Sequence, residues 1–180
     1  MIHDNSSQHE SVSEGVGIRV GACHWDHEHW QKRFYPEDLP EDWRLSYYAN
    51  EFSAVLLPTS VLRCNEEQLE SWGEDAGEGF RFFAVEDTEP QPGVNTLSFP
   101  ETFAHCFAGY VDLKSSKHTD IKIDKKSAVA VINVSSKDLR GWREWLQQNA
   151  SGLRAIFLND SSLTYQQLND FKTLVELLNL

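Results

Sequence analysis

Side chains that could carry out chemistry are concentrated just after the first predicted strand of this 180-residue chain. One thiol, three imidazoles and two carboxylates lie close together there: Cys23, His24, Asp26, His27, Glu28 and His29. Thiolate, imidazole and carboxylate groups are the usual ligands of transition metals, so a divalent metal held by the first four is one interpretation. The other is a polar surface loop whose Trp25 and Trp30 pack inward. The sequence has no HExxH motif, which favours the surface loop, and we predict no cofactor.

Cys23 is also a candidate nucleophile. A nucleophilic thiol needs a neighbouring base and a group that orients that base. His24 is adjacent in sequence, but successive residues of a strand point to opposite faces, which directs His24 away from Cys23. We therefore expect Cys23 to be a buried structural thiol.

Candidate ligand-binding side chains lie in the same loop and at the ends of two other predicted strands, where sites of α/β proteins are usually built. They are Trp25, His29, Trp30, Arg63, Asn159 and Asp160. Together they could bind a small anion or a hydroxyl-bearing ligand. Asn159 and Asp160 have a second interpretation, in which they cap the following helix or bond to the loop backbone.

Alternating strands and helices are predicted to position these residues. The strands are expected at 17–23, 53–57, 80–85, 127–134 and 153–158. Helices are expected to begin near Pro40–Glu41, at Asn65, at Ser135 or Ser136, and at Thr164. The first helix is expected to bury Trp43 and Tyr47. Strands separated by helices pair in parallel through right-handed crossovers, so the pattern indicates an α/β fold.

The alternation breaks between residues 86 and 126. Short strands are predicted at 96–99 and 106–113, with no amphipathic helix of normal length between them. The lysines of Lys114–Lys126 are interspersed with aspartates and lack an aromatic residue for base stacking, so we interpret this basic stretch as a solvated loop. The acidic run Glu66–Glu78 is interpreted as an exposed helix face.

Charge and cysteine content narrow the classes of protein to consider. Acidic residues outnumber basic ones 28 to 16, for a net charge of −12. Nucleic-acid backbones bind basic side chains, so no nucleic-acid partner is expected. Cys23, Cys64 and Cys106 are widely spaced and form no CxxC pair, which is typical of reduced thiols in a cytoplasmic protein.

The organisation expected from composition is a polar, disordered tail over residues 1–16 followed by one α/β domain over 17–180. The tail lacks the basic and apolar regions of a signal peptide. No apolar run approaches the roughly 20 residues that span a bilayer, so no membrane association is expected.

Several motifs resemble a known family. They are Gly21–Trp25 (GACHW), His29–Trp30, Phe34–Pro36 (FYP), Gly79–Val85 and Phe157–Asp160. These are similar to the patterns G-T-x-G-W-S-Y-x-x-W…F-Y-P, G-F-x-F-x-V and F-N-N-D of the YecE-like family (DUF72). The resemblance covers residues 17–87 and, more loosely, 139–180. It implies a TIM-like β/α barrel whose activity is not established.

The chain departs from that family at polar positions. Leu56 and Pro58 stand where the family has a glutamate and an asparagine, and Glu86 stands where it has a basic residue. A full (β/α)8 barrel needs roughly 250 residues, so the resemblance implies a reduced or incomplete barrel in a shortened, divergent member.

These departures lead to two hypotheses from different classes. The favoured one is a non-catalytic scaffold that binds a small ligand, or that associates with itself or with a protein partner. The alternative is a metal-assisted hydrolase of phosphoester-type substrates that uses the histidine-rich loop.

Overall fold

The computed structural model describes residues 17–63, 65–86, 99–114 and 120–180, without the side chains of Thr59 and Arg63. Within these ranges the strands are β1 (Arg19–Ala22), β2 (Ala54–Pro58), β3 (Arg81–Val85), β4 (Phe107–Val111), β5 (Ile121–Asp124), β6 (Val129–Ile132) and β7 (Ala155–Leu158). The α-helices are α1 (Arg44–Glu51), α2 (Glu66–Asp75), α3 (Glu101–Cys106), α4 (Leu139–Asn149) and α5 (Tyr165–Leu177). The α/β class predicted from the sequence is confirmed.

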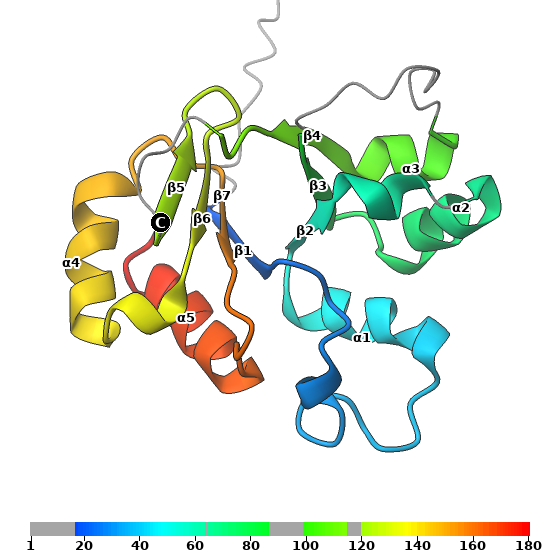
Figure 1. The fold of residues 1–180 in the computed structure, drawn as a ribbon, viewed down its shortest axis with the longest axis horizontal. Coiled ribbons are helices and arrows are strands. Elements are labelled where there is room, and N and C mark those ends of the chain that lie inside the picture. The colour runs from blue at the N-terminus through cyan, green and yellow to red at the C-terminus, as the bar shows by residue number, and fades with distance from the viewer. Residues whose placement is uncertain (1–16, 64, 87–98, 115–119) are drawn as a thin grey trace, which may run out of the picture.

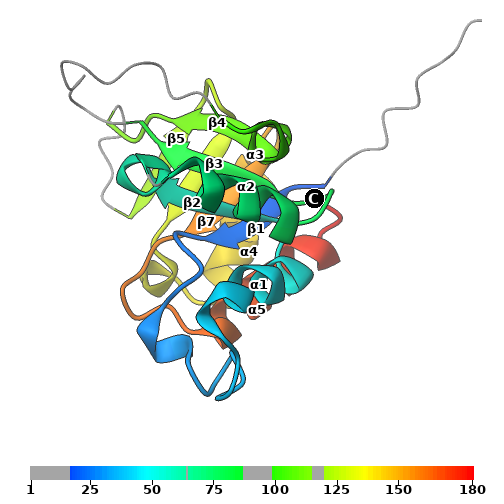
Figure 2. The same cartoon turned by 90° about the vertical axis from the view of Figure 1, so that its right-hand side faces the viewer.

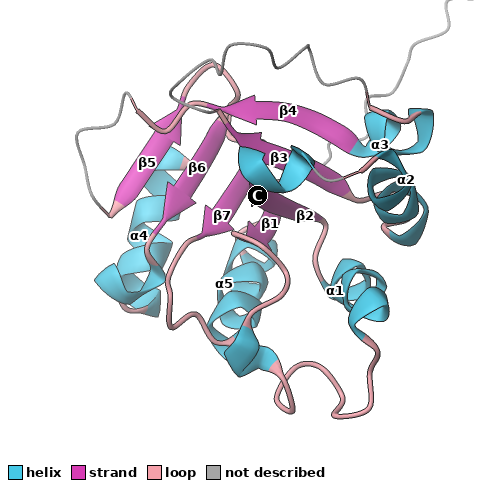
Figure 3. Cartoon of the chain, turned by 45° about the vertical axis from the view of Figure 1, so that its right-hand side comes forward, coloured by secondary structure: helices cyan, strands magenta, loops and turns pink. Residues whose placement is uncertain are grey.

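The strands form two sheets that meet at β1 and β2. One sheet has the order β1-β7-β6-β5 and the other the order β2-β3-β4. All pairings are parallel except that of β5 with β6. A parallel bridge between Cys23 and Leu56 joins the sheets at the carboxyl end of β1 and the middle of β2. The result is one curved wall of strands with the helices outside it (Figure 1, Figure 3).

The hydroxyl of Tyr48 in α1 completes the junction between β1 and β2. It accepts a hydrogen bond from the Ala22 N–H at 2.8 Å and donates one to the Ala54 carbonyl at 3.0 Å. The strands come so close at Gly21 that a Cβ there would lie 1.9 Å from the Ala54 oxygen. A side-chain hydroxyl and a glycine therefore replace the regular ladder at this point.

The two faces of the wall are both apolar but differ in what covers them. The outer face packs against the helices (Figure 1, Figure 2). Tyr48, Trp142 and Phe171 are fully buried there. The inner face has its own buried cluster, made of Ala54, Leu56, Phe83, Val111, Val129, Val131, Ala155 and Phe157. Side chains of β2, β3, β4, β6 and β7 meet there without any helix between them. The wall is therefore curved enough for the side chains of its inner face to fill the space that it encloses.

The described strands do not form a closed barrel, because no ladder joins β4 to β5. Two side chains link β4 and the residue after it to the other sheet instead. Asp124, at the end of β5, accepts a hydrogen bond from the Asp112 N–H at 3.0 Å. Arg154 donates from Nη2 to the Ala108 carbonyl in β4 at 3.0 Å. Within the described part of the chain, no helix is both long and apolar enough to cross a membrane.

Several predicted elements are confirmed, and a few details were wrong. Asn65 caps α2 by accepting from the Gln68 N–H, and Thr164 and Gln167 form the expected capping box of α5. Trp43, predicted to be buried, is 63% exposed because the chain enters α1 through a 3₁₀ turn that turns this ring outward. The N-cap of α4 is Asp138, not Ser135 or Ser136.

The segment between β3 and β6 differs most from the prediction. A six-residue helix, α3, precedes β4, and part of the stretch interpreted as a solvated loop is the antiparallel strand β5. The strand expected at 106–113 is confirmed as β4. Residues 96–98 of the other expected strand, and the predicted tail 1–16, lie outside the described residues.

Candidate functional site

The loop that follows β1 is held by aromatic packing and by hydrogen bonds to a distant carbonyl. Trp30 is fully buried, and its Nε1 donates to the Leu163 carbonyl at 2.6 Å. The His29 Nε2 contacts the same carbonyl, in the loop between β7 and α5. Tyr35 donates its hydroxyl proton to the Trp25 carbonyl at 2.6 Å. The backbone path of the loop is therefore fixed at Trp25, His29 and Trp30.

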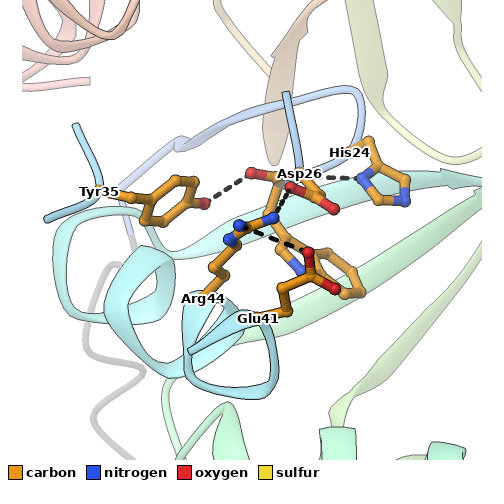
Figure 4. A network of polar contacts seen from close by, with 6 residues as sticks. His24, Asp26, Tyr35, Glu41 and Arg44 are labelled. Carbon is orange, nitrogen blue, oxygen red and sulfur yellow. Dashed lines mark hydrogen bonds and ion pairs between the residues drawn. The ribbon is translucent and has the colours of Figure 1, made fainter. Parts of the chain in front are cut away.

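An ion-pair network lies on the outer side of this loop (Figure 4). The Arg44 guanidinium, almost fully buried, donates to Asp26 Oδ1 at 2.7 Å and lies 3.7 Å from Glu41. It also sits over the ring of Tyr35, 5.9 Å from the centroid. Aromatic faces and carboxylates together are the usual environment of a desolvated guanidinium. The first turn of α1 thus places Arg44 against the β1 loop.

His24 is positioned by a strained backbone and by its own hydrogen bond. Its φ is +70°, a left-handed conformation that is uncommon outside glycine. The Asp26 N–H donates to its Nδ1 at 2.9 Å, which leaves the proton of the neutral ring on Nε2. The ring stacks on Trp25 at 4.9 Å between centroids. Burial lowers the pKa of His24, against the opposing effect of Asp26, so the ring is neutral at pH 7.

His27 points into the aromatic packing rather than toward His24. Its ring lies 4.4 Å from that of Trp30 and 5.6 Å from that of His29, between centroids. Burial lowers the pKa of His27, and its neighbours His29 and His24 lower it further. Its Nε2 is buried without a hydrogen-bond partner in the described structure. A neutral imidazole at this position serves as a packing group.

Cys23 and the metal hypothesis can be judged from the same geometry. Burial raises the pKa of the Cys23 thiol to about 12, so it is protonated at neutral pH. A thiol in that state is neither a nucleophile nor a ready metal ligand. Across the ranges 17–63, 65–86, 99–114 and 120–180, no group of three or more His, Cys, Asp or Glu side chains is placed to hold a metal.

Among the other predicted ligand-binding residues, Asp160 is engaged with nearby serines. Asp160 accepts hydrogen bonds from the Ser162 N–H and hydroxyl at 2.9 and 2.8 Å, and it contacts the Ser135 hydroxyl. These bonds, the backbone one first, lower the pKa of Asp160. Asp160 thus bonds to the loop backbone, as its second interpretation proposed. Asn159 is exposed, and the side chain of Arg63 lies outside what is described.

A cleft does open beside Trp25, on the side of α2. We call it the Trp25 cleft; it is lined by His24, Trp25, Asp26, Glu41, Asp42, Leu45, Val61, Gln68, Ser71, Trp72 and Asp75, and its volume is about 330 Å³. The Trp25 and Trp72 rings meet edge to face at 4.9 Å and form its aromatic wall. Four carboxylates surround the opening. The size lies at the lower end of small-molecule pockets.

The sequence predicted only some of the residues that line this cleft. Trp25, His24 and Asp26 were candidates, but Arg44, Trp72 and Asp75 were not. Trp72 shares a helical face with Leu69, a signal that indicates core packing rather than a ligand contact. Asp75 lies in the acidic run Glu66–Glu78, whose sequence pattern indicates an exposed helix face. No pattern in the sequence shows that this run turns back onto the β1 loop.

Comparison with known proteins gives one match. Residues 19–85 match the model of the family "Protein of unknown function DUF72". No curated protein and no solved structure matches the chain significantly. The looser resemblance over residues 139–180 lies beyond the match and stays a prediction. The match ends with β3, so it spans β1, the whole histidine-rich loop, α1 and α2. Through these residues the chain is similar to the DUF72 (YecE-like) family.

Proposed function

We propose that this protein is a non-catalytic member of its family that binds a guanidinium or ammonium group in the Trp25 cleft. The observation that supports this most directly is the pairing of an aromatic wall with unpaired carboxylates. Asp42 and Asp75 both line the cleft, and neither forms an ion pair with any described cation. A cation over a tryptophan face, beside a carboxylate, gains both electrostatic and cation–π stabilisation.

Arg44 supports this choice of ligand from within the molecule. Its guanidinium already lies between the Tyr35 ring and the carboxylates of Asp26 and Glu41. Arg44 neutralises part of the negative charge of the cleft wall and leaves Asp42 and Asp75 without a described cationic partner. A second cation between those carboxylates and Trp72 would reproduce the same chemistry. The net charge of −12 also steers cations toward the surface.

Two features support a non-catalytic role. Leu56 is buried in the apolar cluster of the inner face, where the family pattern has a glutamate. The imidazoles of the β1 loop accept a backbone hydrogen bond, contact a carbonyl or pack among aromatic rings, which supports a packing role for them over that of a general base. General acid–base catalysis needs a group within reach of substrate and with a pKa near the working pH.

The metal-assisted hydrolase gains no support from these positions. His24 and His29 direct one ring nitrogen each at backbone groups that lie in different loops. Metal analysis of untagged protein tests this alternative. Stoichiometric zinc or manganese that is lost on His24→Ala would contradict the non-catalytic proposal.

We also propose that residues 17–180 form one domain derived from a reduced β/α barrel, working in the cytoplasm. The pairing of β1 with β7, and its bridge to β2, support the single domain. The apolar interior enclosed by strands from both sheets supports the barrel origin. Cys23 and Cys106 are free thiols, as expected in a reducing compartment.

The binding proposal is tested with a matched pair of ligands. N-acetylarginine amide carries one guanidinium charge, and N-acetylcitrulline amide has nearly the same shape without that charge. We expect saturable quenching of tryptophan fluorescence by the arginine compound only. Asp75→Asn and Trp72→Phe should each weaken binding about 3- to 10-fold, from the loss of one charge contact or of the better cation–π ring.

Trp43→Phe is the control for this titration. Trp43 is 63% exposed and does not line the cleft, so this variant should bind like the wild type while losing a background fluorophore. Equal responses to both ligands would contradict the proposal. So would an unchanged affinity in Asp75→Asn that unfolds at the wild-type temperature.

A further inference from the structure

Three arginines gather at the amino-terminal end of the strands, away from the Trp25 cleft. Arg19 is the first residue of β1, Arg81 is the first residue of β3, and Arg154 directly precedes β7. In the sheet registers Arg19 pairs with Ala155 and Arg81 pairs with Ala54. The Arg81 side chain points to the same face as that of Phe83, because alternate residues of a strand share a face. Small alanines therefore leave room between the guanidinium groups.

These arginines enclose a cavity of about 220 Å³, lined by Arg19, Arg81, Phe83, Ala108 and Arg154. Phe83 is buried and belongs to the inner apolar cluster, so it closes one side of the cavity. The Arg154 guanidinium lies 5.0 Å from the centroid of the Phe83 ring. We call this cavity the arginine mouth. It is the amino-terminal opening of the space enclosed by the curved wall of strands.

The positive charges of the arginine mouth have no described counter-charge. No ion pair joins Arg19, Arg81 or Arg154 to a carboxylate anywhere in the described ranges. Burial lowers the pKa of Arg19, and the neighbouring charges of Arg81 and Arg154 lower it further. Like charges held together in this way destabilise the fold unless an anion lies between them. The rest of the chain is strongly acidic, which makes the local excess of positive charge more unusual.

Two of the guanidinium groups are held in place by backbone carbonyls. Arg81 donates from Nη1 to the carbonyls of Glu78 and Phe80, at 2.9 and 2.6 Å. Arg154 donates from Nε to the Ser127 carbonyl at 2.6 Å and from Nη2 to Ala108. Each guanidinium has five N–H donors, so both keep donors for a ligand, and the Arg19 guanidinium donates to no acceptor among the described residues. The groups are ordered before any ligand arrives, which reduces the entropic cost of binding.

We propose that the arginine mouth binds a phosphate group, as free phosphate or as the monoester of a small molecule. Planar guanidinium groups match the oxygens of a phosphate in bidentate pairs, and three of them can contact different oxygens of one tetrahedral anion. The cavity is large enough for a phosphate with a small organic substituent. The site lies at the opposite end of β1 from the Trp25 cleft and is independent of the cationic ligand proposed there.

Thermal unfolding and calorimetric titration of the full chain test this proposal. The probes are inorganic phosphate and glycerol 3-phosphate, with chloride at equal ionic strength as the reference. We expect either probe to raise the unfolding temperature saturably, by about 3–5 °C at a tenfold excess over its Kd. Tighter binding of glycerol 3-phosphate would identify a phosphorylated small molecule as the ligand class, and tighter binding of phosphate would identify the free anion.

Arg19→Gln and Arg81→Gln separate binding from folding. Each should weaken phosphate binding about tenfold or more, because one charge-assisted contact is lost. Each should also keep or raise the unfolding temperature in chloride, because a like-charge repulsion is relieved. Arg140→Gln is the control, since Arg140 is an exposed residue of α4 that does not line the arginine mouth and that pairs with Glu144.

Three results would overturn the proposal. One is a response to phosphate no larger than that to chloride. Another is a phosphate effect that Arg140→Gln diminishes as much as Arg19→Gln does, which would indicate general screening of charge. The third is a loss of stability in chloride for Arg19→Gln with unchanged phosphate affinity, which would make the arginines structural.

Discussion

The buried carboxylate of Asp124 shows how one side chain holds parts of this structure that no strand ladder joins. It accepts hydrogen bonds from the Ser127 hydroxyl at 2.6 Å, from the Lys126 N–H at 2.9 Å and from the Asp112 N–H at 3.0 Å. Burial by itself would raise the pKa of Asp124, but these hydrogen bonds outweigh it and the pKa is lowered. Asp124 therefore fastens the end of β4 to the turn between β5 and β6.

The lowered pKa of Asp124 predicts how the free energy of unfolding changes as the pH falls. A carboxyl whose pKa is lower in the folded than in the unfolded state stabilises the fold above its unfolded pKa of about 3.9. That contribution is lost as the pH falls through the folded value. Asp124→Asn should cost about 1–3 kcal/mol at pH 7, because at least one donor loses its charged acceptor. Chemical denaturation at several pH values should show this cost shrinking below about pH 4.

Asp38→Asn is the matched control for this measurement, since Asp38 is exposed. It should leave the stability at pH 7 within about 0.5 kcal/mol of the wild type. A cost in Asp124→Asn that stays constant from pH 7 to pH 3 would show that the ionised carboxylate is not what stabilises this junction.

Among the secondary-structure elements, the junction of β1 with β2 is the place where helix and sheet depend on each other. The Tyr48 hydroxyl of α1 satisfies one backbone donor of β1 and one backbone acceptor of β2. Burial raises the pKa of Tyr48 far above the neutral range, against the lowering effect of the hydrogen bond from the Ala22 N–H, so the hydroxyl remains a donor at all physiological pH. The Trp25 cleft and the inner apolar cluster both depend on this junction, because the β1 loop begins there.

Tyr48→Phe should therefore destabilise the fold although it keeps the ring. The Ala22 N–H and the Ala54 carbonyl would both be left buried without a partner, at a cost of roughly 2 kcal/mol or more. Guanidinium denaturation measures this change. Tyr110→Phe removes the hydroxyl of an exposed tyrosine and should be neutral. Equal stabilities of the two variants would mean that Tyr48 acts only through its ring.

At the same scale, the sequence predicted elements well where the apolar pattern was long. The strands predicted at 53–57 and 80–85 are apolar apart from Ser53 and Arg81, and they became β2 and β3. The missed strand β5 has only Ile121 and Ile123 as its apolar alternation, set among charged residues, and it owes its conformation to pairing with β6. The six residues of α3 are too few to show a helical period. Local patterns could not reveal elements that tertiary contacts stabilise.

At the scale of the whole molecule, the chain combines an apolar interior with two differently charged openings. The Trp25 cleft lies at the carboxyl end of β1 and is acidic, whereas the arginine mouth lies at the amino end and is basic. The acidic cleft was predicted only in part. His24, Asp26 and Trp25 follow β1 directly, but Asp75 and Trp72 reach them from α2 through a packing of helices that the sequence does not encode locally. Asn159 was grouped with these residues, yet it lies on the exposed end of β7.

The most direct test of the account is a ¹H–¹⁵N NMR titration of the full chain with N-acetylarginine amide. The account predicts saturable shifts of the indole N–H signals of Trp25 and Trp72 and of the Ser71 and Asp75 amides, with those of Asn159 and Asp160 unmoved. Shifts centred on Asn159, Asp160 and His29, or no saturable shifts at all, would contradict the claim that the cleft beside Trp25 is a binding site for cations.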